Sequence, residues 1–141
     1  MERILVGVGP RHPNLWAAGH AMGLAKRMKA TVSVLLVMDP GSQEPATGQA
    51  PYRQKLEALM EQARSEGLAV DYYVSQGRYE DEVVRFIKEN KVTMLVIEQP
   101  AGRKGSSMES NKLIEKIRHR VDCRIEVVQG TGRSSTALKP T

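Results

Sequence analysis

The sequence is poor in cysteine, in aromatic residues and in long apolar runs. Cys123 is the only cysteine among 141 residues, which excludes an intrachain disulfide and a metal site built on several thiolates. No apolar run approaches the roughly 20 residues that span a membrane, and the N-terminus lacks the apolar stretch of a signal peptide. We therefore expect a chain of the reducing cytoplasm, without membrane insertion, whose single thiol is packed and inert.

Aromatic residues make up 4% of the chain, and Lys and Arg outnumber Asp and Glu by 21 to 16. The excess lies within residues 101–141, which hold nine basic and four acidic residues. Nucleic-acid binding usually needs a basic face together with a groove-reading helix or an aromatic stacking surface, and the sequence shows neither. A solvated basic face is the favoured interpretation, and no nucleic-acid partner is expected.

Familiar catalytic and metal-binding signatures are also missing. The chain has no P-loop, no G-x-G-x-x-G fingerprint and no G-x-S-x-G elbow. Its three histidines, His12, His20 and His119, lack the spacing of metal ligands. The acidic run from Glu80 to Glu82 fits the first turn of a helix, whose dipole stabilises carboxylates. We expect no metal site, and the sequence favours a binding function over catalysis.

What the sequence does contain is an alternation of short apolar runs with amphipathic segments. The run from Ile4 to Val8 is too short for a helix and rich in β-branched residues, as in a strand buried on both faces. From Leu15 to about residue 29, apolar residues recur every three or four positions, which predicts a helix with Asn14 as its N-cap. The pattern continues with strands at 32–38, 69–74, 94–97 and 125–128, and with helices from 52 to about 67, from about 80, and across 113–121.

Strands that alternate with helices at this spacing predict βαβ units with right-handed crossovers. The predicted fold class is α/β, with three layers and a doubly wound, five-stranded parallel sheet in the order 3-2-1-4-5. Ligands of such sheets bind beyond the carboxyl ends of the strands, where the strand order reverses. With that order, the crevice lies between strands one and four, and segments 9–14 and 98–110 meet there.

The second of these segments combines glycines, hydroxyls and two adjacent cations. Glycines let consecutive N–H groups point at an anion, and the cations add full charges. A loop of this composition also occurs on surfaces that bind nothing, so both interpretations stay open. The candidate nucleotide- or anion-binding residues are Gly9 and Arg11 in the first segment, Val37 in the second strand, and Gly102, Arg103, Lys104, Gly105, Ser106 and Ser107 in the second segment.

Taken together, these segments resemble the universal stress protein family across nearly all of residues 2–129. The resemblance implies the order 3-2-1-4-5, a homodimer formed through the last strand and, in one branch of the family, ATP held by the two loops. That branch carries an Asp just after the first strand and a G-x-x-G followed nine residues on by Gly-Ser or Gly-Thr. The segments that carry the likeness are Ile4 to Val8, Val34 to Pro40, Val74 to Gly77, Glu82 to Glu89, Met94 to Ile97 and Cys123 to Val128.

The nucleotide motif departs from that branch at three places. Gly9 stands where the Asp is expected and has no side chain to bond adenine or ribose. Asn111-Lys112 stands where the Gly-Ser pair is expected. Glu98 adds a carboxylate near the expected phosphates, which opposes anion binding unless Arg11 or Arg103 neutralises it. The positions that match the ATP-binding branch are Val37, Gly102 and Gly105.

Two hypotheses of function follow. The first is a universal-stress-type domain over residues 1–129 with a flexible tail over 130–141, acting in the cytoplasm as a dimeric regulatory or binding module without tight ATP binding. The second is a nucleotide-binding protein for ATP or AMP, or a slow ATPase, with a rearranged phosphate loop from Gly102 to Ser107. A regulatory domain of a larger protein is a third interpretation, although Met1 directly before the first strand resembles a natural start. The predicted dimer edge is an apolar last strand and consists of Ile125, Val127 and Val128.

Overall fold

The computed structural model describes residues 2–9, 13–40, 51–99 and 112–129. Within these ranges, strands and helices alternate in the predicted order. The elements are β1 (Arg3–Val8), α1 (Leu15–Met28), β2 (Thr31–Met38), α2 (Pro51–Ser65), β3 (Val70–Gln76), α3 (Tyr79–Glu89), β4 (Met94–Gln99) and β5 (Arg124–Gln129), and residues 112–118 are also helical.

The five strands form one sheet in the order β3-β2-β1-β4-β5. Every neighbouring pair is parallel, and at the centre of the sheet Val6 lies opposite Val34 on one side and Val96 on the other. The predicted class, strand direction and strand order are therefore confirmed.

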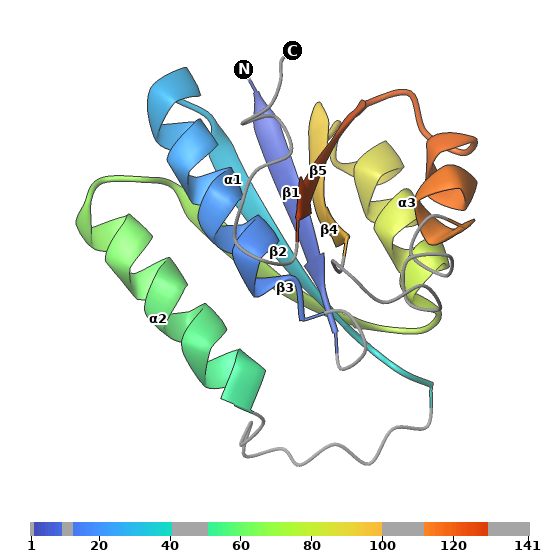
Figure 1. Ribbon diagram of the computed structural model, residues 1–141, viewed down its shortest axis with the longest axis horizontal. Coiled ribbons are helices and arrows are strands. Elements are labelled where there is room, and N and C mark those ends of the chain that lie inside the picture. Colours follow the sequence, from blue (N-terminus) through green and yellow to red (C-terminus); the bar gives the residue numbers. More distant parts are fainter. Residues whose placement is uncertain (1, 10–12, 41–50, 100–111, 130–141) are drawn as a thin grey trace.

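Helices cover both faces of the sheet, as Figure 1 shows, with α1 and α2 on one side and α3 with the helix at 112–118 on the other. Successive side chains of a strand point to opposite faces, and β1 accordingly supplies both core clusters. Ile4 and Val6 pack in the cluster with α1 and α2, whereas Leu5 packs in the cluster with α3. Strands buried on both faces explain the uninterrupted apolar runs in the sequence.

Two local expectations are corrected by the structure. Glu98 and Gln99 belong to β4 and not to the following loop, because they continue the parallel pairing opposite Val128 and Gln129 of β5. Asn14 is the N-cap residue of α1, as predicted, and its carbonyl oxygen accepts from the Ala18 N–H at 2.9 Å, but it adopts a left-handed backbone conformation and its side chain makes no capping hydrogen bond. No helix in the described ranges is long and apolar enough to cross a membrane.

Candidate functional site

The strand order reverses between β1 and β4, and ligands of doubly wound sheets bind beyond the carboxyl ends of the strands at such a point. We refer to this position, beyond the ends of β1 and β4, as the crevice. β4 ends at Gln99, and Asn14 lies between β1 and α1. The Glu98 backbone N–H donates to Asn14 Oδ1 at 3.2 Å and joins the two segments. Their predicted convergence is confirmed for the residues that the structure describes.

Asn14 is the centre of a buried hydrogen-bond network, with only 5% of the residue exposed. Its Nδ2 donates to the Gly7 carbonyl oxygen at 2.6 Å and to the Tyr79 hydroxyl at 3.1 Å. The Tyr79 hydroxyl in turn donates to the same Gly7 oxygen at 2.8 Å. The Asn14 side chain is therefore committed to β1, α3 and β4, which explains why it does not cap α1.

Tyr79 was not singled out by the sequence analysis, because its partner Gly7 lies 72 positions away and no local pattern links the two. Burial raises the pKa of Tyr79 well above its ordinary value, and the negative charge of Glu98 adds to the effect, while the hydrogen bond from Asn14 acts in the opposite direction. The hydroxyl therefore stays protonated at neutral pH. Its proton is donated to the Gly7 carbonyl oxygen of β1.

Glu98 reaches from the end of β4 to the first turn of α1. Its Oε1 accepts hydrogen bonds from the backbone N–H of Trp16 at 3.1 Å and of Ala17 at 3.4 Å. These are orphan donors of the helix N-terminus, where a negative charge also interacts favourably with the helix dipole. Burial nevertheless raises the pKa of Glu98, with the two backbone bonds acting against that shift. Glu98 thus performs the capping role that the sequence assigned to Asn14.

Gly9 lies directly after β1 and packs against the backbone of β2. A Cβ atom added to Gly9 would lie 2.8 Å from the Val37 carbonyl oxygen, closer than real Cβ contacts. The Val37 side chain is 2% exposed and belongs to the core cluster on the α3 side of the sheet. An acidic side chain at Gly9 would therefore require the backbone of β1 or β2 to move.

The remaining predicted anion-binding residues lie outside the described residues. They are Arg11, Gly102, Arg103, Lys104, Gly105, Ser106 and Ser107, and His12 is outside as well. Of the candidate set, the structure therefore describes only Gly9 and Val37, and it adds Asn14, Glu98, Tyr79 and Trp16 around them. Trp16 is a further residue that the sequence analysis missed, and 52% of it is exposed.

The last strand forms one edge of the sheet, as predicted, because β5 pairs only with β4 among the described strands. Ile125 and Val127 are partly buried against the core on the α3 side, whereas Val128 is 2% exposed and packs on the α1 side. Burial raises the pKa of Cys123, which lies just before this strand, as expected for an unreactive thiol.

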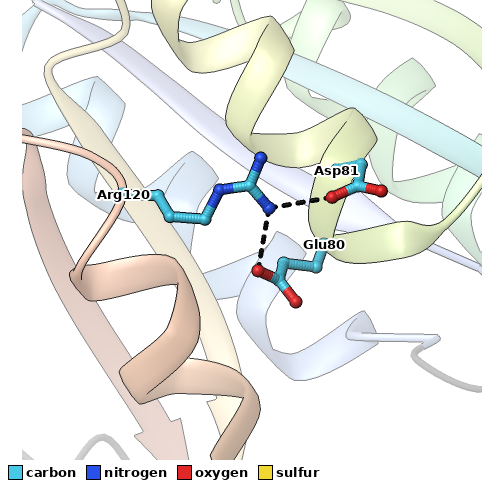
Figure 2. A network of polar contacts seen from close by, with 3 residues as sticks. All are labelled: Glu80, Asp81 and Arg120. Carbon is cyan, nitrogen blue, oxygen red and sulfur yellow. Dashed lines mark hydrogen bonds and ion pairs between the residues drawn. The ribbon is translucent and has the colours of Figure 1, made fainter.

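The acidic run from Glu80 to Glu82 occupies the first turn of α3, as predicted from the helix dipole. Figure 2 shows Arg120, which follows the helix at 112–118, reaching the first two of these carboxylates. Arg120 Nη1 lies 2.8 Å from both Glu80 Oε2 and Asp81 Oδ1, and the hydrogen bond from Arg120 lowers the pKa of Asp81. The cluster joins two elements on one face. Across the described ranges, no group of three or more His, Cys, Asp or Glu residues is arranged to hold a metal ion.

The fold is that of a doubly wound α/β protein, and the candidate site lies where its strand order reverses. The family model described as the universal stress protein family matches residues 1–129. The chain belongs to that family, which confirms the resemblance found in the sequence.

Solved structures with the same fold cover nearly the whole chain. A universal stress protein in complex with cAMP is 18% identical with a TM-score of 0.65, and the match covers 90% of this chain and 96% of that chain. A universal stress protein from Archaeoglobus fulgidus in complex with dAMP is 15% identical with a TM-score of 0.61, covering 90% and 97%. UspA from Lactobacillus plantarum is 15% identical with a TM-score of 0.62, covering 89% and 96%. No curated protein sequence matches the chain significantly.

Proposed function

We propose that this chain is a cytoplasmic, dimeric binding module of the universal stress protein family that acts in regulation, without catalytic turnover and without tight ATP binding. The folded unit is the segment 1–129, and residues 130–141 form a tail. The crevice between β1 and β4 is where a small ligand binds, because the strand order reverses there.

The observation that carries the proposal is the contact between Gly9 and Val37. In the ATP-binding branch the residue just after the first strand is an Asp, and here that position is Gly9. A Cβ atom at Gly9 would lie 2.8 Å from a backbone oxygen, so the acidic grip on adenosine is absent and the packing leaves no room for it. A nucleotide must therefore bind without one of its polar contacts, which weakens the complex.

Calorimetric titration of the full chain with ATP, ADP and AMP tests the proposal. We expect none of the three nucleotides to bind as tightly as a cofactor that copurifies with its protein. Their dissociation constants should be no lower than about 0.1 mM. ATP that copurifies with the protein, or that binds with a dissociation constant near 1 μM, would contradict the proposal.

A second candidate function is nucleotide binding or slow ATP hydrolysis through a rearranged loop from Gly102 to Ser107. It is favoured by the fold neighbours whose structures contain cAMP and dAMP. In this alternative, Arg103 and Lys104 replace the lost contacts to phosphate. Binding heat that disappears in Gly105→Asp but persists in Gly23→Asp, a change at a half-buried position of α1 where an added Cβ meets nothing within 4 Å, would support it.

A further inference from the structure

We propose that Glu98 sets the charge selectivity of the crevice. Its carboxylate disfavours ligands that carry phosphate and leaves uncharged nucleosides unaffected. This inference rests on the proposed function only in taking the crevice between β1 and β4 as the ligand site. According to this inference, Glu98 is the residue that makes the crevice reject phosphate.

The first step is the fixed position of the carboxylate. The Glu98 backbone is tied to Asn14 Oδ1 at 3.2 Å, and its Oε1 is tied to the Trp16 N–H at 3.1 Å. Two bonds, counting that from Ala17, hold the side chain against the start of α1, and the bond to Asn14 holds the Glu98 backbone at the end of β4. The carboxylate therefore keeps its position when a ligand binds, whereas the side chain of an exposed glutamate would change its rotamer.

The second step is the charge of the surroundings. Among the described residues, the groups that bond the Glu98 side chain are the backbone N–H groups of Trp16 and Ala17. They carry the partial positive charge of the α1 N-terminus, roughly half an elementary charge, and therefore offset only part of the negative charge of the carboxylate. The side chain is half-buried, so its charge is screened less than that of a surface carboxylate. A phosphate entering the crevice therefore meets an opposing negative charge at the point where the two central strands end (Figure 1).

The third step is the size of the effect. Two like charges about 8 Å apart at an effective dielectric constant near 20 repel strongly enough to change affinity by tenfold or more. Phosphate groups at that range should therefore bind about tenfold more tightly when Glu98 loses its charge. A ligand without phosphate should not respond, because an uncharged nucleoside has no net charge for the carboxylate to repel.

The experiment compares adenosine, AMP and ATP by calorimetry on the full chain. Glu98→Gln removes the charge and keeps an oxygen that can accept the two helix N–H bonds. Glu98→Ala removes both. The matched control is Glu89→Gln, which changes the net charge equally but lies at the C-terminal end of α3, five residues before the start of β4, whereas the crevice lies beyond the end of that strand. Thermal unfolding of each variant identifies any that fails to fold.

We expect Glu98→Gln and Glu98→Ala to bind AMP and ATP about tenfold more tightly than the natural chain, with adenosine and the Glu89→Gln control unchanged. Equal nucleotide affinity in the natural chain and both Glu98 variants, an equal gain in Glu89→Gln, or an equal gain for adenosine would overturn the inference. Neutralisation of Glu98 by Arg11 or Arg103 would give the first of these results. Tight ATP binding by the natural chain contradicts the proposed function instead, and a further gain in Glu98→Gln would still support the role of Glu98.

Discussion

Asn14 holds a backbone conformation that few residues tolerate. Its φ of 48° lies in the left-handed region, which costs an ordinary residue roughly 1–2 kcal/mol but is tolerated by Asn better than by most others. The side chain compensates by donating to the Gly7 oxygen and accepting from the Glu98 N–H. One buried amide thus ties the end of β1 and the end of β4 to the start of α1.

Replacement of Asn14 should separate the contribution of its side-chain hydrogen bonds from the cost of its left-handed backbone conformation. Asn14→Ala loses the buried hydrogen bonds and keeps the strained φ, so we expect the free energy of unfolding to fall by about 2–4 kcal/mol. Asn14→Gly loses the same bonds without the strain, so its loss should be about 1 kcal/mol smaller. Urea unfolding measures both values. Equal losses would show that the backbone relaxes, and a loss below about 1 kcal/mol in Asn14→Ala would show that the network contributes little.

Glu98 should make stability depend on pH in an unusual direction. Burial raises its pKa in the folded chain, so ionisation is less favourable in the folded state than in the unfolded state. The contribution of Glu98 to the free energy of unfolding is therefore lost as the pH rises from the pKa of Glu98 in the unfolded chain through its higher pKa in the folded chain. Glu98→Gln does not titrate, so its unfolding free energy relative to the natural chain should increase between about pH 4 and pH 7.

The same comparison on Glu89→Gln is the control for Glu98, because that residue is exposed at the end of α3. Denaturant unfolding across this pH range measures the difference for each variant. A difference for Glu98→Gln that stays flat, or that decreases with rising pH, would show that the hydrogen bonds from Trp16 and Ala17 outweigh the cost of burial.

At the scale of elements, β1 and α3 approach each other through a glycine. A Cβ atom on Gly7 would lie 2.9 Å from the Tyr79 hydroxyl and 2.9 Å from Val83 Cγ2. The hydroxyl is fixed because it bonds the Gly7 oxygen itself, and Val83 is fully buried. The strand and the helix therefore pack at a distance that only glycine permits.

Two glycine-to-alanine changes should accordingly have opposite signs. Gly7→Ala overpacks the contact between β1 and α3, and we expect a loss of about 1–3 kcal/mol in unfolding free energy. Gly23→Ala lies within α1, where an added Cβ meets nothing within 4 Å, and should gain about 0.5–1 kcal/mol from helix propensity. Chemical denaturation of the two variants measures both. A neutral Gly7→Ala would mean that Tyr79 moves aside at little cost.

At the scale of the whole molecule, the sheet presents two edges, β3 and β5. An edge strand is a template for pairing with another chain. Composition does not decide between the two edges, because Ile125, Val127 and Val128 of β5 pack against the core of this chain, whereas Tyr73 and Val74 of β3 are exposed. We assign the proposed dimer to β5 because the resemblance to the universal stress protein family implies pairing through the last strand.

Hydrogen exchange at two protein concentrations tests this assignment, since the β3 edge serves as an internal control. We expect sedimentation to show a dimer at micromolar concentration, and dilution to speed exchange in β5 but not in β3. A monomer at that concentration, or protection that changes at β3 alone, would contradict the predicted edge.

Most of the architecture was predictable because it depends on patterns within a few residues. The apolar runs of β1, β2 and β4 and the helical spacing of α1 are local, and the alternation of the two leads to a parallel doubly wound sheet. The acidic first turn of α3 was predictable for the same reason. Arg120 as its partner was not, because it lies 39 and 40 positions away from Asp81 and Glu80.

The candidate site was predictable only in outline. The sequence alone determined the strand order that brings the carboxyl ends of β1 and β4 together, and that Gly9 offers no side chain to a ligand. Only the tertiary structure decided that Asn14 turns away from α1 and that Glu98 caps that helix. Those choices depend on contacts between residues 82 and 84 positions apart, where burial and hydrogen-bond satisfaction across the sheet outweigh the preference of any single segment.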